Sequence, residues 1–227
     1  MMTNLFSTFD PATSTSLSLN WTSTFLGIMI MPYMYWVTPN RYTKLITIII
    51  NKLHAEFKTL MGQSKGFTLL MIALFMMILF NNAMGLLPYI FTSSSHMVFT
   101  MTLALPVWIA VMMFGWINKT QAMFSHLIPM GTPPLLMPFM VCIETASNLI
   151  RPGALAVRLM ANMFAGHLSM SLLGNSTMNS SNILIMMMIM LQMGFMLFEF
   201  AVALIQAYVF SMLSTLYTSE VAYEKKT

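Results

Sequence analysis

Apolar residues gather in five long stretches along this chain, separated by short polar connections. The first three cover residues 17–37, 67–90 and 97–117 and are each close to the ~20 residues that an α-helix needs to cross a bilayer. The last two cover 134–173 and 182–217 and are nearly twice as long. The pattern predicts an all-α membrane protein with about five spans.

The two longest stretches predict a long tilted helical hairpin. One helix over 134–173 would be about 60 Å long, roughly twice the hydrocarbon core of a bilayer. Pro152 and Gly153 can kink this helix, but no polar loop is present in which the chain could turn back. An uncharged segment rich in turn formers, 174–181, leads into the second long stretch. Because no soluble domain or internal repeat appears, residues 1–227 are expected to form one membrane domain.

Residues 41–65, between the first two stretches, combine basic and apolar side chains at helical spacing. Leu45, Ile49, Leu53 and Phe57 follow one another at intervals of four residues, which indicates a helix with one apolar face. Such a helix lies on the membrane surface with its charged side toward water. A plain solvated connector is the alternative.

Composition excludes the soluble class. Hydrophobic residues make up 58% of the chain and charged residues 7%, whereas soluble domains average about 25% charged residues. The net charge is +4, but the basic residues are scattered along the chain. They form no basic stripe interleaved with aromatic residues, so a nucleic-acid partner is not expected. A lipid bilayer is the expected surrounding.

With five spans, the basic residues outside the long stretches all fall on one side of the membrane. The positive-inside rule then places the N-terminus outside and the C-terminus inside. These basic residues are Arg41, Lys44, Lys52, Lys58, Lys65, Lys119, Lys225 and Lys226.

Each long stretch carries a column of polar side chains at intervals of seven residues, which lie nearly in line on a helix. Asn148 and Asn162 extend the first column. The two columns are Glu144, Arg151 and Arg158, then Gln192, Glu199 and Gln206. A charge at bilayer depth costs at least a few kcal/mol, so such groups have a partner, a water-filled cavity or a function.

Two interpretations of these charges remain open. In the first, Glu144–Arg151 and Arg158–Glu199 are ion pairs that only hold helices together. In the second, the charges line a pathway, in which His167 can exchange protons near neutral pH. Arg158 would lie about 21 Å from Glu144 and about 14 Å from His167 along a helix. This spacing suggests two separate polar approaches with a permanent positive charge between them.

No metal-ligand spacing, phosphate loop or nucleophile–base pair is present, so neither a cofactor nor a catalytic residue is expected.

Several motifs resemble the subunit-a family of F-type ATP synthases in its mitochondrial, arthropod-like animal form. The longest runs from Ile150 to Leu168 and reads IRPGALAVRLMANMFAGHL. The others are FNNAMGLLPY at 80–89, GTP at 131–133, ETASN at 144–148 and ALIQAYVF at 203–210. They are distributed along most of the chain.

The resemblance implies a proton-translocating stator subunit of the mitochondrial inner membrane, facing a ring of c subunits. The N-terminus would face the intermembrane space and the C-terminus the matrix. Peripheral-stalk and other membrane-sector subunits are the implied partners, and protons the transported ion. Arg158 matches the family's essential arginine, which would favour the ionised form of each passing ring carboxylate and block a direct proton leak.

The resemblance also assigns the other polar residues. His167 and Glu199 match the half-channel open to the intermembrane space, and Glu144 and Glu220 match the matrix half-channel. Gln206 and Asn162 match polar residues near the arginine. Arg151 departs from many relatives, which have a neutral residue, and receives only a supporting role.

Two other functions would also use intramembrane charges. An ion-coupled secondary transporter predicts internal pseudo-repeats and broken helices, and the sequence contains no repeat. A non-conducting structural subunit of a respiratory complex would use the charges only for pairing.

Overall fold

The computed structural model describes residues 5–32, 35–62, 66–128, 133–178 and 181–222. All regular secondary structure in these ranges is helical, which confirms the predicted all-α class. The α-helices are α1 (Ser23–Ile30), α2 (Arg41–Met61), α3 (Phe67–Gly85), α4 (Met97–Asn118), α5 (Thr120–His126), α6 (Met137–Thr177) and α7 (Asn182–Ala222). Short 3-10 helices η1 (Leu5–Phe9), η2 (Leu19–Thr22) and η3 (Ser93–Ser95) complete the set.

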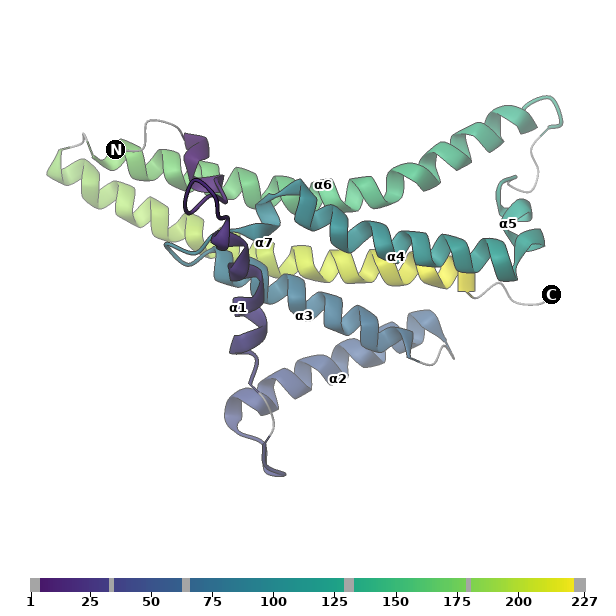
Figure 1. The fold of residues 1–227 in the computed structure, drawn as a ribbon, viewed down its shortest axis with the longest axis horizontal. Coiled ribbons are helices and arrows are strands. Elements are labelled where there is room, and N and C mark those ends of the chain that lie inside the picture. The colour runs from purple at the N-terminus through teal and green to yellow at the C-terminus, as the bar shows by residue number, and fades with distance from the viewer. Residues whose placement is uncertain (1–4, 33–34, 63–65, 129–132, 179–180, 223–227) are drawn as a thin grey trace.

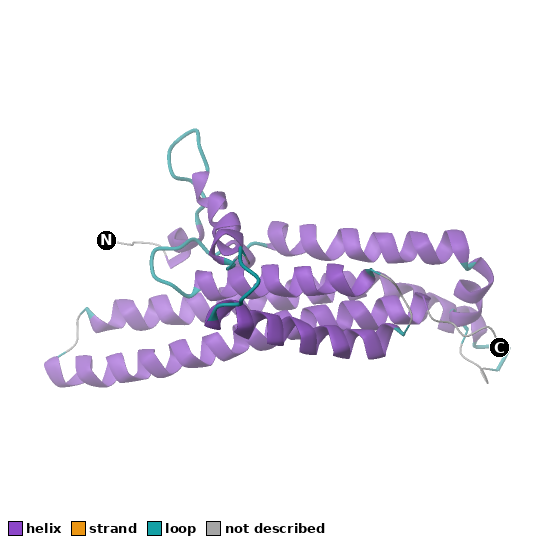
Figure 2. Ribbon diagram, turned by 90° about the horizontal axis from the view of Figure 1, so that it is seen from below, coloured by secondary structure: helices purple, strands orange, loops and turns teal. Residues whose placement is uncertain are grey.

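The two long helices α6 and α7 form an antiparallel pair that runs the length of the molecule (Figure 1). α4 packs mainly on α6, and α3 packs mainly on α7. α2 covers α3 and α7 from below in Figure 1, whereas α1 crosses α3 at a steep angle. Figure 2 shows the same elongated bundle from below, with the α6–α7 hairpin extending beyond α3 and α4.

α6 begins three residues after the predicted 134 and ends four residues after the predicted 173, whereas α7 begins at the predicted 182 and ends five residues after 217. α6 and α7 have 41 residues each, so each is about 60 Å long. α6 contains Pro152, which has no N–H to donate to the Asn148 carbonyl, and the helix bends along its course (Figure 1). A helix twice as long as the hydrocarbon core is wide has to tilt in order to remain in the membrane.

Among the described residues, three helices are long and apolar enough to cross a membrane. They are α3, α4 and the segment Ile183–Val221 of α7. α6 has equal length but carries Glu144, Arg151 and Arg158, which lower its mean hydropathy. The count of five spans stays a prediction.

The first apolar stretch differs from the prediction of one continuous helix over 17–37. Its α-helix, α1, has eight residues and is therefore only about 12 Å long, too short to cross the hydrocarbon core on its own. α1 ends at Ile30, two residues before Pro32. Proline disfavours helical geometry in the residue before it and cannot donate a backbone hydrogen bond, which explains the early end.

α2 is a helix, as predicted for 41–65, but its buried face is offset by one residue. Leu53 and Phe57 are buried as expected, whereas Leu45 and Ile49 stay exposed. Ile46 and Ile50 instead pack against the core. The offset arises because α2 lies against α3 and α7 as well as facing the membrane surface. Lys65, at the end of the predicted segment, lies outside the described residues.

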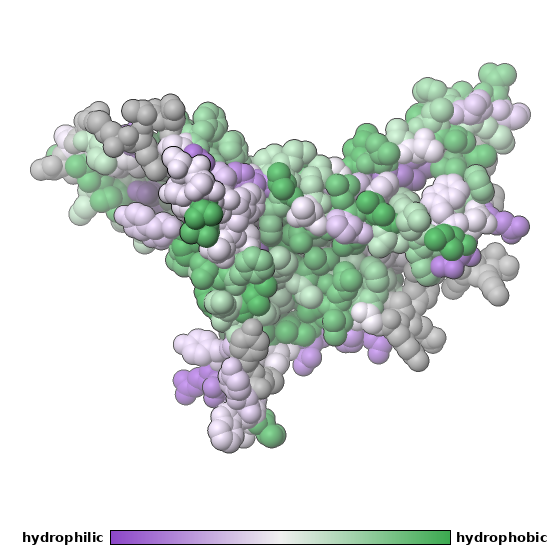
Figure 3. All heavy atoms as spheres, in the orientation of Figure 1, coloured by the Kyte–Doolittle hydropathy of each residue, from purple (hydrophilic) through white to green (hydrophobic). Residues whose placement is uncertain are grey.

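The core lies where α2, α3, α4, α6 and α7 meet. Ala156 of α6 and Ala207 of α7 have no exposed surface, and such small side chains let helix backbones approach closely in a membrane. Leu159 and Phe210 fill the space beside them. Figure 3 shows apolar residues over the middle of the molecule and polar residues toward its ends and along α2.

We predict that Ala156→Leu destabilises the bundle, because the added side chain enters a fully packed contact. Overpacking of this kind costs about 1–3 kcal/mol. Ala146→Leu, on the exposed part of the same helix, is the matched control. Thermal unfolding of the detergent-solubilised protein should show a lower midpoint for Ala156→Leu alone. Equal midpoints for the two variants would contradict the packing described here.

Candidate functional site

Arg158 lies near the middle of α6 and points away from the bundle. Its side chain is exposed, whereas Leu155 and Leu159 on either side are buried in the core. Among the described residues, Arg158 has no hydrogen bond or ion pair. The predicted pair between Arg158 and Glu199 is therefore absent from the structure.

The surface around Arg158 is formed by small residues. Ala154, Ala161 and Ala165 are exposed and lie three, four or seven residues from Arg158, which places them on the same helix face. A face of this kind allows another helix to approach the backbone closely. Ala156, two residues before Arg158, is by contrast buried inside the bundle.

Asn162 and Gln206 join the two long helices next to the arginine. Asn162 Nδ2 donates a hydrogen bond of 2.8 Å to Gln206 Oε1. Asn162 lies one turn after Arg158 on α6, and Gln206 is buried on α7. The structure therefore brings together the two amides that the sequence analysis assigned to the neighbourhood of Arg158.

His167 and Glu199 lie at the contact of α6 and α7 toward the hairpin turn. Glu199 Oε1 and His167 Nε2 are buried and have no hydrogen-bond partner within the described part of the chain. Gly166 makes room for the carboxylate, because a methyl group at this position would come within 2.8 Å of Glu199 Oε1. The absence of a side chain at Gly166 thus determines where Glu199 lies.

Two cavities share His167 and Glu199 in their walls. The first has a volume of about 660 Å³ and is also lined by Gln192, Ser171 and the loop after α3. The second has a volume of about 480 Å³ and extends to Asn162. Both are large enough for several water molecules, which occupy about 30 Å³ each. With His167 and Glu199 in common, their walls extend from the α3–α4 loop to Asn162, one turn from Arg158.

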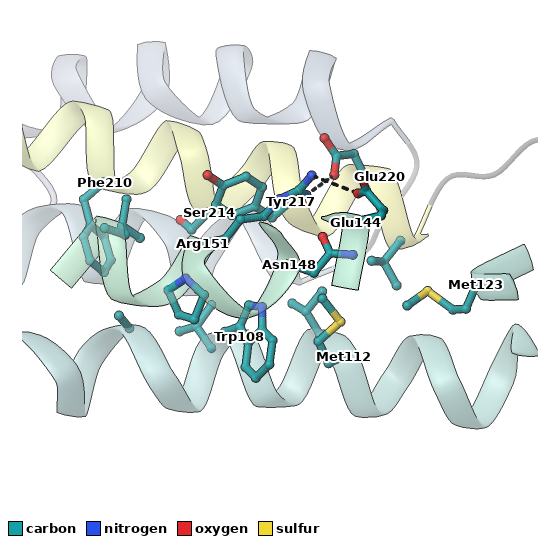
Figure 4. Close-up of a pocket in the computed structure, with 16 residues that line it drawn as sticks. Trp108, Met112, Met123, Glu144, Asn148, Arg151, Phe210, Ser214, Tyr217 and Glu220 are labelled. Atoms are coloured by element: carbon teal, nitrogen blue, oxygen red, sulfur yellow. Dashed lines mark hydrogen bonds and ion pairs between the residues drawn. The ribbon is translucent and has the colours of Figure 1, made fainter. Parts of the chain in front are cut away.

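A third cavity lies at the opposite end of the hairpin (Figure 4). Its volume is about 320 Å³, and its walls contain Glu144 and Asn148 of α6, Glu220 of α7 and Trp108 of α4. The predicted inner-side residues therefore converge on one space. Asn148 extends this polar wall along α6 toward Arg158, which lies about 15 Å away along the helix axis.

Arg151 occupies the centre of this third cavity. Its Nη1 lies 2.7 Å from Glu220 Oε2, and its Nη2 lies 3.8 Å from Glu144 Oε1. The guanidinium also stacks over Tyr217, at 5.1 Å from the ring centroid. The ion pair between Glu144 and Arg151, which the sequence analysis left open, is formed.

The sequence analysis missed two features of this cavity. The Arg151–Glu220 pair joins residues 69 positions apart, and no local spacing signals such a contact. Tyr217 lies three residues before Glu220, on the same face of α7, which is a signal that could have been used. Among the described residues, no group of three His, Cys, Asp or Glu side chains could hold a metal ion.

Comparison with known proteins identifies close relatives. The sequence model described as "ATP synthase A chain" matches residues 14–219. The chain is 59% identical over 223 residues to ATP synthase subunit a of Drosophila melanogaster, covering 97% of this chain and 100% of that protein. It is 59% identical over 225 residues to ATP synthase subunit a of Anopheles gambiae, with the same coverage. The protein of that name from Aedes aegypti is 58% identical over 225 residues, again covering 97% of this chain and 100% of the relative.

We predict a measurable coupling between Arg151 and Glu220 in a double-mutant cycle with Arg151→Met and Glu220→Gln. Both side chains are partly exposed, at 30% and 57%, so the coupling should be about 0.5–1 kcal/mol. A cycle with Glu144→Gln should give a smaller value because its contact is longer. Thermal unfolding of the single and double variants measures both values. No coupling to Glu220 would mean that the pair contributes nothing to stability.

Proposed function

Because this chain belongs to the ATP synthase A chain family, we propose that it is the proton-translocating stator subunit of an F-type ATP synthase. It performs no bond-making chemistry of its own. It couples proton flow across the inner mitochondrial membrane to rotation of a c-ring, and so to ATP synthesis.

The observation that carries the proposal is the exposed guanidinium of Arg158, which pairs with none of the described residues and lies on a face of small residues. A charged group facing hydrocarbon is costly, whereas a passing carboxylate of a neighbouring subunit would offset that cost. A guanidinium keeps its positive charge under any realistic condition. We therefore assign the α6 face around Arg158 to the contact with the c-ring.

Arg158 acts by electrostatics in this mechanism. As a protonated ring carboxylate approaches, the guanidinium favours its ionised form and so drives release of the proton. The ionised carboxylate then passes the arginine and takes up a proton on the other side. A permanent cation between the two sides also opposes direct passage of a proton, since like charges repel.

The cavities supply the two offset half-channels. The cavities at His167 and Glu199 serve the intermembrane-space side and end near Asn162 and Gln206. The cavity at Glu144, Asn148 and Glu220 serves the matrix side. The two half-channels lie on opposite sides of Arg158 along α6. A proton can therefore pass from one half-channel to the other only while bound to a carboxylate of the rotating ring. The tilted α6–α7 hairpin gives the ring a long face to turn against.

The orientation follows from the basic residues. α2, with Arg41, Lys44, Lys52 and Lys58, lies on the matrix side, so the N-terminus faces the intermembrane space and the C-terminus the matrix. Lys65, Lys225 and Lys226 support the same side but lie outside the described residues. Peripheral-stalk and other membrane-sector subunits bind the remaining surfaces, and lipid covers what they leave.

We predict that Arg158→Lys and Arg158→Ala both abolish coupled ATP synthesis while the complex still assembles. Lysine can lose its proton when it is desolvated, and it lacks the planar fork of arginine. ATP synthesis by reconstituted enzyme under an imposed proton gradient, compared with the amount of assembled complex, measures the effect. Near-normal synthesis by either variant would overturn the role given to Arg158.

We predict that Gly166→Ala slows proton entry several-fold, because the added methyl group displaces the Glu199 carboxylate. Gly174→Ala on the same helix is the matched control, since nothing lies within 4 Å of a methyl group there. Voltage-driven proton flux through the reconstituted membrane sector measures both variants. Equal flux in the two would show that the packing of Glu199 against Gly166 does not limit proton entry.

A further inference from the structure

An apolar groove lies on the far side of the bundle from the α6 face around Arg158, between α1, α2 and α3. Figure 1 shows α1 crossing α3 while α2 diverges from α3 beneath it, so the three helices enclose a wedge. A cavity of about 620 Å³ occupies this wedge. Its walls are mainly apolar and include Ile28, Met31, Ile72, Ala73, Met77 and Phe80. None of the residues assigned to proton transfer contributes to it.

The groove has the dimensions of one lipid chain. It follows α3 from Thr68 to Asn81, a distance of about 20 Å along the helix axis. One leaflet of the hydrocarbon core is about 15 Å thick, half of the full width. A membrane-crossing helix, about 10 Å wide and 30 Å long, has a volume of about 2,400 Å³. Such a helix is too large for the groove, which could accept only a few of its side chains.

The edge of α2 next to the groove carries basic and neutral polar side chains. The edge next to the groove contributes Asn51 and His54 to its wall. Lys44 lies seven residues before Asn51, and Lys58 lies four residues after His54, so both belong to the same edge. Both lysines are exposed and have no ion pair or hydrogen bond within the described ranges.

The acidic residue of α2 lies on its other edge. Glu56 is the only acid between Arg41 and Met61, and its Oε2 accepts a hydrogen bond of 3.2 Å from the Tyr208 hydroxyl of α7. The contact with α7 therefore holds the carboxylate away from the groove. The groove edge is left with cationic and neutral polar groups, beside an apolar channel as long as a lipid chain.

We propose that this groove is a binding site for an anionic phospholipid. One acyl chain lies between α1 and α3, and the phosphate lies at the α2 edge near His54, with Lys58 one turn away and Lys44 farther along the same edge. α2 is an amphipathic helix at the membrane surface, where each nearby basic residue attracts an anionic headgroup. The site would anchor α2 and fill the wedge that the short α1 leaves beside α3.

The test uses the intact complex in phospholipid nanodiscs with photoactivatable lipids that carry the reactive group in the acyl chain. Phosphatidylglycerol and phosphatidylcholine probes are compared, and labelled peptides are mapped by mass spectrometry. We expect labelling of α1 and α3 near Met31 and Met77, at least fivefold stronger with the anionic probe. Equal labelling by both probes, or labelling only at other helices, would overturn the proposal.

Variants separate the two halves of the site. Lys44→Glu with Lys58→Glu should abolish the preference for the anionic probe, whereas Lys52→Glu, on another face of α2, should retain it. Ala73→Phe should reduce labelling several-fold by filling the groove, and Ala110→Phe, on the exposed surface of α4, is its control.

A cross-linker at position 73 that captures a peptide of another subunit would show a protein in the groove and overturn the proposal. Proton-driven ATP synthesis is measured in parallel, so a failure here is distinguishable from a failure of the proposed proton pathway.

Discussion

A permanent positive charge in the middle of an apolar helix constrains this molecule more than any other feature. Arg158 cannot lose its proton, and the bundle offers it no carboxylate among the described residues. These surroundings are explained if a carboxylate of a moving neighbouring subunit neutralises the guanidinium for part of the time. The small residues around it then allow close approach, and the hydrogen bond between the amides of Asn162 and buried Gln206 joins α6 and α7 beside it.

Two arginines seven residues apart on α6 have opposite environments. Arg151 lies between Glu144 and Glu220 and over the ring of Tyr217, so its charge is satisfied within the chain. Arg158 has no such contacts. The structural-pairing interpretation is therefore right for one arginine and wrong for the other. The difference arises because α7 presents Glu220 to Arg151, whereas Arg158 is exposed and pairs with no carboxylate of the described residues.

Features that depend on local sequence could be predicted well. The lengths of α6 and α7 follow from their uninterrupted apolar runs, and the heptad spacing marked a column of polar residues on each helix. The Arg151–Glu220 pair depends on how α7 is aligned against α6, which no local pattern specifies. The one-residue offset on α2 has the same cause, since α3 and α7 select the face that is buried. The early end of α1 could have been predicted from Pro32. Because Pro32 lies inside a continuous apolar run, hydropathy alone does not reveal this end.

The account depends on what Arg158 faces in the assembled enzyme. The most direct measurement is the distance between its guanidinium and the nearest c-ring carboxylate, in a structure of the assembled membrane sector. The account predicts that a ring carboxylate comes within about 4–6 Å of the guanidinium, the range over which an opposite charge stabilises an ionised acid. A structure in which Arg158 instead pairs with carboxylates of its own subunit, out of reach of the ring, would contradict it.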